Sequence, residues 1–284
     1  MKHSAFLLVA TAACGTIAAA QAPVVPAAEQ AAIVATALDY GEGWYSGAPE
    51  RMERAIHPDL NKVVVQALPQ AGRFVVGYST YSGLIEMTRA KVGMLPPERR
   101  KLQGAALSMV GDVAFAKVTS AMFNDFLTMV KIDGQWRIVN VLWVPGPDAP
   151  NRSMLPAADA ATDSVAISRT VADFVRGLQT SDAVLLEKVL HPEVNIAGFA
   201  AFPGAKPAIT RTRYSGIVEA ARAKMIPVVA EASRTSQARI VDMMDGMAFV
   251  EVALPNAFFA LQLANLGGEW KILNVLNKRI MPGR

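Results

Sequence analysis

The feature of this sequence that most constrains its fold is an internal duplication with an offset of 134 residues, the interval from His57 to His191. The first copy contains ALDYGEGWYSGAPERMERAIHPDL from Ala37, and the second contains VADFVRGLQTSDAVLLEKVLHPEV from Val171. The same interval relates further pairs: Asp39 and Asp173, Gly43 and Gly177, Phe115 and Phe249, Trp136 and Trp270, and Asn140 and Asn274. A match this long with almost no gaps indicates a duplicated domain, because the repeats of solenoids are far shorter.

Residues 1–20 have the composition of a cleavable export signal. Lys2 provides the positive start, Ala5–Ala13 an apolar run too short to span a bilayer, and Ala18–Ala20 a cleavage site of small residues. We therefore expect a periplasmic or secreted protein. The only cysteine, Cys14, lies in this segment and offers lipid attachment as a less favoured alternative; conventional cleavage leaves no thiol for disulfides or catalysis.

The charge of the chain gives little reason to expect binding to nucleic acid or to a membrane surface. The formal net charge of +4 is spread along the sequence without a block of Lys and Arg, so nucleic acid is not expected as a partner. No later apolar run is long enough to span a membrane without charged residues. The 52% hydrophobic content suffices for two domain cores.

Hydrophobic periodicity predicts three helices in each copy, two at its start and a third after two short strands. The apolar stripe of the first helix comprises Ile33, Ala37, Tyr40, Gly41 and Trp44, matched by Ile167, Val171, Phe174, Val175 and Leu178. Pro49 can begin a short second helix that runs through Ile56, and His57-Pro58 ends it. The third helix presents Tyr81, Leu84, Ile85, Thr88 and Val92, matched by Tyr214, Ile217, Val218, Ala221 and Met225.

The remainder of each copy is typical of strands and tight turns. The expected strands of the first copy are Asn61–Leu68, Arg73–Tyr78, Ala105–Val110, Val113–Met122, Phe126–Ile132 and Trp136–Val144. Asp133-Gly134 is a strong hairpin signal. Helices followed by a strand meander indicate an α+β domain. We expect domains at residues 27–144 and 162–280, joined by a proline-rich linker at 145–161.

This order of elements, with DYGEGWYSGAPERMERAIHPDL and WRIVNVLW, resembles the nuclear transport factor 2-like superfamily and, within it, the family named "putative lumazine-binding". The resemblance implies two tandem cone-shaped domains, each a curved antiparallel sheet wrapped around three helices with an open pocket. It also implies that the two domains pack as an internal pseudo-dimer. The second copy departs from the first where Leu178-Gln179 replaces Trp44-Tyr45, so the aromatic pair is present in the first copy alone.

His57 and His191 are the only histidines left after signal cleavage, and histidine titrates near neutral pH. His57 is therefore the single, weak candidate for a catalytic acid or base. The alternative is a structural imidazole that bonds to the backbone where the second helix ends. Two histidines without a cysteine do not make a usual zinc site, so we expect neither metal nor cofactor.

Five residues of the first copy are candidates for binding a ligand: Trp44, Tyr45, His57, Tyr81 and Asn140. Trp44 and Tyr45 could form an aromatic wall, although Trp44 lies on the stripe expected to be buried. Asn140 lies within an apolar strand, where its amide needs either a ligand or a backbone partner. The hydroxyl of Tyr81 could reach a pocket from the start of the third helix.

The leading hypothesis is an exported, non-catalytic protein that binds a small, partly apolar or aromatic ligand, with a lumazine or pterin suggested by the family name alone. Enzymes of this fold use carboxylates on the pocket wall, but Asp125, Asp242 and Glu251 are neither paired nor matched between copies. The alternatives are an isomerase, dehydratase or hydrolase, and an envelope interaction module whose cones are filled by Met109, Met122 and Met129.

Overall fold

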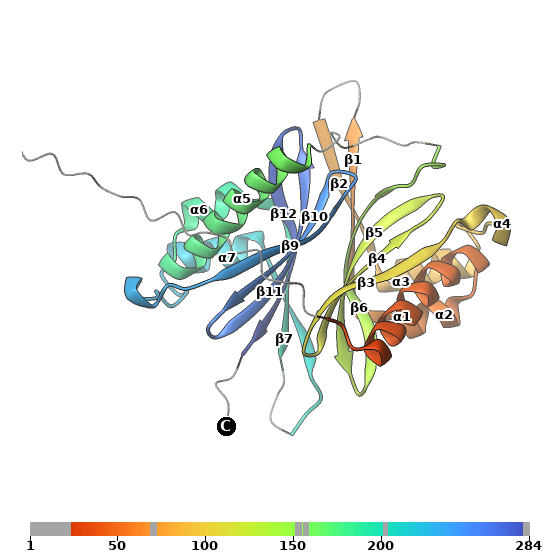
Figure 1. The fold of residues 1–284 in the computed structure, drawn as a ribbon, viewed down its shortest axis with the longest axis horizontal. Coiled ribbons are helices and arrows are strands. Elements are labelled where there is room, and N and C mark those ends of the chain that lie inside the picture. Colours follow the sequence, from red (N-terminus) through yellow and green to blue (C-terminus); the bar gives the residue numbers. More distant parts are fainter. Residues whose placement is uncertain (1–23, 69–72, 151–154, 156–158, 201–203, 281–284) are drawn as a thin grey trace, which may run out of the picture.

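The computed structural model describes residues 24–68, 73–150, 155, 159–200 and 204–280. The predicted signal peptide and Cys14 lie outside the described residues. The described chain forms two domains in which helices and strands follow the same order (Figure 1). Within these residues no helix is both long enough and apolar enough to cross a membrane.

The element bounds follow the local signals in the sequence. The first domain contains α1 (Ala27–Ser46), α2 (Pro49–Ala55), β1 (Ile56–Leu68), β2 (Arg73–Thr80), α3 (Tyr81–Arg89), α4 (Pro97–Arg100), β3 (Gln103–Val110), β4 (Val113–Thr119), β5 (Phe123–Ile132) and β6 (Gln135–Pro145). The second contains α5 (Ala160–Thr180), α6 (Ala183–Val189), β7 (Leu190–Ala200), β8 (Ala208–Arg213), α7 (Tyr214–Arg222), η1 (Glu231–Ser233), β9 (Gln237–Met244), β10 (Met247–Leu254), β11 (Ala257–Leu266) and β12 (Glu269–Arg279). Gly47 ends α1 in the left-handed conformation and Pro49 begins α2, as predicted.

The third helix of each domain is shorter than expected. Lys91 and Lys224 adopt positive φ angles of 60° and 56°, which ends the helical run. Val92 and Met225 therefore lie beyond α3 and α7 and are exposed, rather than on the buried faces of those helices.

The two sheets are mixed, which corrects the expectation of antiparallel sheets. In the first sheet, of order β2-β1-β6-β5-β4-β3, the β1–β6 pairing is parallel and the other four pairings are antiparallel. The second sheet has the equivalent order, with a parallel β7–β12 pairing. Hairpin signals report only neighbouring strands, whereas β1 and β6 lie at opposite ends of the domain's strand sequence.

The predicted hairpin turn is present in both domains. Asp133 and Gly134 have φ angles of 51° and 77°, and Gly267 and Gly268, which occupy the equivalent turn of the second domain, have φ angles of 74° and 98°. Two successive positive φ angles define the type I′ turn, whose twist suits a two-residue hairpin.

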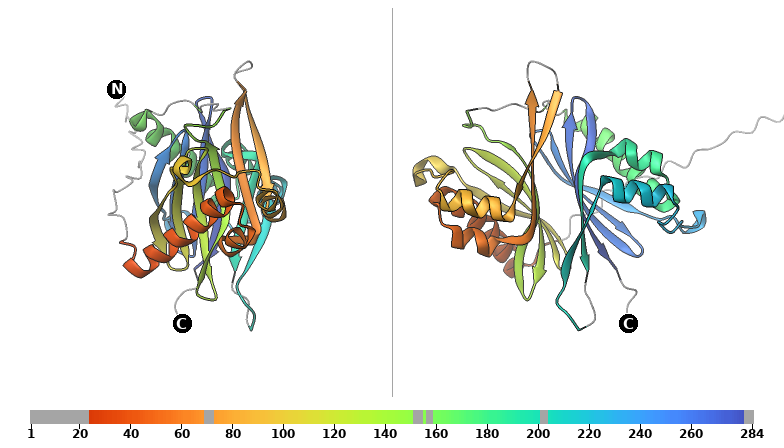
Figure 2. Two further views of the ribbon diagram at one scale, coloured as in Figure 1. Left: turned by 90° about the vertical axis from the view of Figure 1, so that its right-hand side faces the viewer. Right: turned by 180° about the vertical axis from the view of Figure 1, so that it is seen from behind.

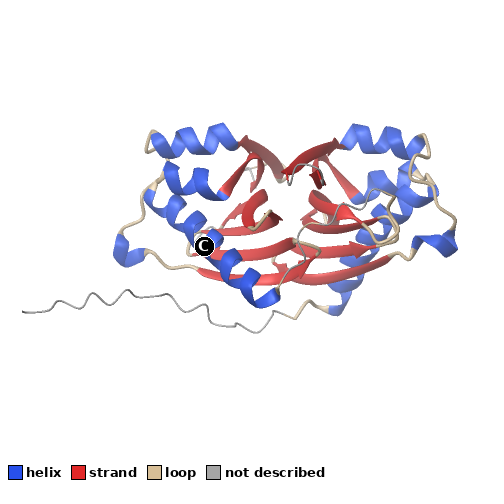
Figure 3. Cartoon of the chain, turned by 90° about the horizontal axis from the view of Figure 1, so that it is seen from above, coloured by secondary structure: helices blue, strands red, loops and turns tan. Residues whose placement is uncertain are grey.

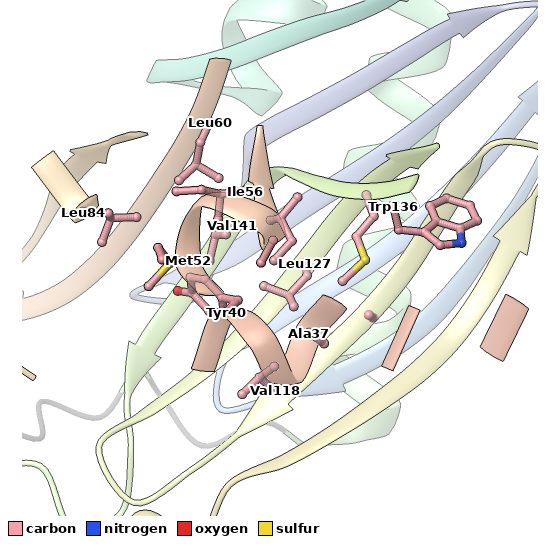
Figure 4. Packing of buried hydrophobic residues seen from close by; sticks show 14 of the residues in the cluster. Ala37, Tyr40, Met52, Ile56, Leu60, Leu84, Val118, Leu127, Trp136 and Val141 are labelled. Atoms are coloured by element: carbon pink, nitrogen blue, oxygen red, sulfur yellow. The ribbon is translucent and has the colours of Figure 1, made fainter. Parts of the chain in front are cut away.

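The helices of the first domain pack on one face of its sheet and bury an apolar core. Figure 4 shows Tyr40, Met52, Leu84, Leu127 and Val141 converging from helices and strands. Trp136 closes one end of this core, where its indole N–H donates to Glu29 at 2.8 Å. Trp270 does the same with Asp163 at 2.8 Å, so both tryptophans are packing anchors.

The opposite faces of the two sheets pack against each other, which leaves the helices on the outer sides of the molecule (Figures 2 and 3). Phe115 and Phe249 meet at the centre of this interface with ring centroids 4.6 Å apart. The residues come from equivalent positions of the two copies. The interface therefore has the arrangement of an internal pseudo-dimer.

A set of buried amides repeats this symmetry. Asn61 donates to the side-chain oxygen of Asn274 at 3.0 Å, and its equivalent Asn195 donates to that of Asn140 at 3.1 Å. Asn140 donates in turn to the carbonyl of Val275, and Asn274 donates to the carbonyl of Val141. Each domain thus supplies the same donors and acceptors to the other.

Candidate functional site

The first domain contains a cavity of about 490 Å³ whose wall is mostly apolar. Its wall includes residues of α1, β1, α3, β5 and β6, together with the segment Val92–Leu95 and residues after β6: Tyr40, Trp44, Met52, Lys62, Gln66, Ser79, Leu84, Met87, Val92, Gly93, Met94, Leu95, Met122, Phe123, Trp143, Pro145, Ala149 and Pro150. A cavity of this volume is large enough for a small organic ligand. Met122 lies in the wall of this cavity and leaves it open, so methionine side chains do not fill the cone of the first domain completely.

Three polar side chains form a buried cluster beside the cavity. The Lys62 ammonium donates to Asp125 Oδ2 at 3.1 Å and to the hydroxyl of Tyr40. The Tyr40 hydroxyl donates to the same Asp125 oxygen at 2.6 Å. Lys62 and Tyr40 reach the cavity wall, whereas Asp125 is completely buried behind them.

The register of the sheet explains why these side chains meet. Lys62 on β1 lies opposite Val141 on β6, and Asp125 on β5 lies opposite Trp143, two residues further along β6. Because residues two apart in a strand share a face, Lys62, Asp125 and Trp143 all face the helices. Tyr40 reaches the same point from α1.

Aromatic rings surround the ammonium of Lys62. Its Nζ lies 4.6 Å from the ring centroid of Trp143, 5.0 Å from that of Tyr40 and 5.4 Å from that of Phe123. Rings at these distances attract a cation through their quadrupoles. Lys62 therefore occupies a cage that compensates in part for the removal of its charge from water.

Burial dominates the electrostatics of the cluster. Removal from water lowers the pKa of Lys62 and raises the pKa of Asp125, and the attraction between the two charges opposes both shifts. Burial, with the nearby Asp125 charge, raises the pKa of Tyr40 well above its usual range, so its hydroxyl stays protonated. One oxygen of Asp125, Oδ1, has no hydrogen-bond partner among the described residues.

The second domain has apolar residues at all three positions. Phe174 stands where Tyr40 does, Ile196 replaces Lys62 opposite Val275, and Phe259 replaces Asp125. The rings of Phe174 and Phe259 pack edge to face with centroids 5.7 Å apart. The polar cluster is thus a property of the first domain alone.

Among the predicted ligand-binding residues, Trp44 and Tyr45 differ from expectation in their burial: Trp44 is the more exposed of the two. Trp44 is half-buried and lines the cavity, with its indole packed over Gly93, where a Cβ atom would lie 1.9 Å from Nε1. Tyr45 is completely buried instead, and its hydroxyl pairs with Ser120 at 2.8 Å and accepts from the amide of Met122. Tyr45 follows Gly41 by four residues and therefore continues the buried stripe.

His57 lies at the start of β1 and does not line the cavity. Its Nδ1 accepts from the amide of Asp59 at 3.0 Å, and His191 accepts from the amide of Glu193 at the same distance. Burial lowers the pKa of both imidazoles. This geometry matches the structural alternative, in which each histidine bonds to backbone groups after the second helix.

Asn140 and Tyr81 are also absent from the cavity wall. Asn140 faces the other domain, where Asn195 and Arg211 each donate to its side-chain oxygen at 3.1 Å. Its amide therefore finds protein partners and not a ligand in the cone. Tyr81 packs against the first-domain core from the start of α3.

Sequence reasoning missed Lys62 and the pairing of Asp125, although a signal was present. At an offset of 134 residues, Tyr40, Lys62 and Asp125 align with Phe174, Ile196 and Phe259. Three polar residues that align with apolar residues in the other copy of a duplicated core indicate a site in one copy only. Among the described residues, no group of three His, Cys, Asp or Glu side chains could hold a metal ion.

Comparisons with known proteins place the chain by family. The family model described as "Putative lumazine-binding" matches residues 28–144 and again residues 162–277. A comparison with curated protein sequences gave no match.

Two solved structures to which the chain is similar each match less than half of it. An NTF-2 like protein of unknown function from Silicibacter pomeroyi is 15% identical, with a TM-score of 0.34, and the match covers 43% of this chain and 100% of that one. A cystatin-like fold protein from Burkholderia xenovorans is 16% identical, with a TM-score of 0.33, covering 44% of this chain and 96% of that one. Because the two matches together cover most of the chain, it belongs to the family described as "Putative lumazine-binding" and contains two tandem copies of the family's domain.

Proposed function

We propose that the first domain binds a small, largely apolar and flat ligand in its cavity. The observation that carries this proposal is the cavity of about 490 Å³, whose wall includes Trp44, Trp143 and Lys62. Pockets of this kind combine apolar walls with a few polar groups that fix the orientation of a ligand. The family description makes lumazine the first probe to use.

The test is a titration with lumazine followed by tryptophan fluorescence, together with native mass spectrometry of the freshly purified protein. Binding is expected to quench Trp44 and Trp143, and a bound mass would identify the natural ligand. Trp44→Leu, which installs the second-domain residue, is expected to weaken binding about tenfold through lost stacking area. The matched control Leu178→Ala changes the equivalent position of the second domain and should leave the affinity unaltered.

A catalytic role for the cavity is a second proposal, favoured by the buried cluster of Lys62, Asp125 and Tyr40. Such a cluster can hold or transfer a proton at a ligand carbonyl, as isomerases and dehydratases require. The test is to incubate the identified ligand with the protein and to look for a product or for solvent deuterium incorporation. Recovery of the unchanged, undeuterated ligand would leave binding as the function.

Export is part of the leading proposal and rests on residues 1–20. Amino-terminal sequencing of the mature protein from fractionated cells tests it directly. A mature chain that begins near Gln21 supports a cleaved signal, whereas a lipid-modified Cys14 supports anchoring.

A further inference from the structure

The donors and acceptors of the Lys62 cluster restrict the chemistry of a ligand, if the proposed cavity function holds. A lysine ammonium has three N–H groups and no acceptor. Asp125 accepts one of them and the Tyr40 hydroxyl accepts another. The third has no oxygen or nitrogen acceptor among the described residues, while Lys62 reaches the cavity wall.

The hydroxyl of Tyr40 cannot supply a second donor to the cavity. Its single proton is directed to Asp125 Oδ2 at 2.6 Å, and one of its lone pairs already accepts from Lys62. The polar feature that the cluster offers a ligand is therefore one charge-assisted N–H group within an aromatic cage. Such a group calls for an oxygen or nitrogen acceptor on the ligand.

The charge of the cluster argues against an anionic ligand. Lys62 and Asp125 already neutralise each other at 3.1 Å, and both side chains are almost completely buried. A ligand carboxylate would add a second negative charge close to the buried Asp125, at a high desolvation cost. A cationic ligand is disfavoured as well, because the ammonium of Lys62 already fills the cage of Tyr40, Phe123 and Trp143.

We infer that the ligand of the first domain is an uncharged, flat molecule with a carbonyl group, such as a lactam or an aromatic ketone, whose oxygen accepts the third N–H of Lys62. The aromatic and methionine side chains of the wall contact the faces of its rings. A lumazine has this chemistry, and so do many other bicyclic carbonyl compounds, so the inference defines a class of ligand.

Three bicyclic probes of similar size test the inference: 2-quinolone, which carries a lactam, 2-naphthoate, which carries a carboxylate, and naphthalene, which has no acceptor. Wild-type protein is expected to bind 2-quinolone roughly tenfold more tightly than either other probe, the gain from about one charge-assisted hydrogen bond. The double variant Lys62→Met/Asp125→Leu removes both charges at similar volume. It should bind 2-quinolone and naphthalene equally.

The control Ile196→Met changes the position equivalent to Lys62 in the second domain and should keep the wild-type preference. Tighter binding of 2-naphthoate than of 2-quinolone would overturn the inference in favour of an anion site. Equal binding of the three probes would show that Lys62 contributes no selectivity, and would leave the cavity function intact. Failure of all three probes to bind at millimolar concentration would count against the cavity function itself, and the inference would fall with it.

Discussion

The two domains share their fold, their turns and their interface, yet they fill the space between helices and sheet in different ways. The first places Tyr40, Lys62 and Asp125 beside a cavity, whereas the second places Phe174, Ile196 and Phe259 at the equivalent positions. Buried apolar residues stabilise a core directly, while a buried ion pair contributes little net stability. The polar set is therefore a feature from which the fold gains little stability.

The sharpest way to test this comparison is to remove one charge and then both. Lys62→Met leaves Asp125 buried without its partner and is expected to cost about 3–5 kcal/mol of unfolding free energy. Lys62→Met/Asp125→Leu, which approaches the apolar second domain, should be near neutral or stabilising. Chemical denaturation measures both, with Ile196→Met as the control. A double variant as unstable as the single one would mean that the cluster is structurally required.

A packed pair of residues in the wall of the first-domain cavity is also replaced in the second domain. Trp44 lies over Gly93, whereas the second domain has Leu178 and, two residues after Lys224, Ile226. Gly93→Ile should displace Trp44, cost about 1–3 kcal/mol and abolish ligand binding. Adding Trp44→Leu should recover most of the stability but not the binding. If Gly93→Ile alone retained both properties, the packing of Trp44 over Gly93 would not define the wall.

The interface between the domains is symmetric, so equivalent substitutions on its two sides should cost the same stability. Asn140→Ala and Asn274→Ala each leave a carbonyl and an amide of the other domain without a partner, at a cost of about 1–3 kcal/mol. Because the hydrogen bonds are mirrored, the two losses should agree closely in denaturant unfolding. A large difference between the variants would show that the extra partners, Arg211 and Gln262, break the symmetry.

Substitution of the two histidines should have the smallest effect on stability, and the effect should again be equal in the two domains. Burial lowers the pKa of His57 and His191 in the folded protein, whereas an unfolded histidine titrates near pH 6.5. The unfolded chain thus binds more protons below about pH 6.5, and stability falls as pH decreases toward the folded-state pKa. Asn at either position preserves an acceptor without a titrating group. His57→Asn and His191→Asn should each flatten the melting temperature between pH 7 and 5 by the same amount; an unchanged slope would contradict the role of burial.

Local signals were sufficient for most of the fold, and non-local contacts account for what they missed. The turn at Asp133-Gly134 and the helix boundary at Gly47 depend on φ angles that few residues adopt, so sequence alone predicts them. The parallel β1–β6 pairing depends on strands far apart in the chain, and no local pattern encodes it.

The candidate site was predicted less well for the same reason. Trp44 was predicted to lie on the buried stripe, with a place in the pocket wall as the alternative, and it lines the cavity. Lys62 follows Asn61 and precedes the apolar run Val63–Val65 of β1, and a lysine there is expected to face solvent. Only the register that brings it to Asp125 reveals its burial.

The mirrored amides have a consequence for how such a molecule can change. In a symmetric dimer of one polypeptide, every substitution appears in both subunits, and assembly depends on concentration. Here the two halves are separate stretches of one chain, held at a fixed effective concentration by the segment between them. One half can therefore keep a costly buried charge pair while the other is packed for stability and supports it, even at high dilution.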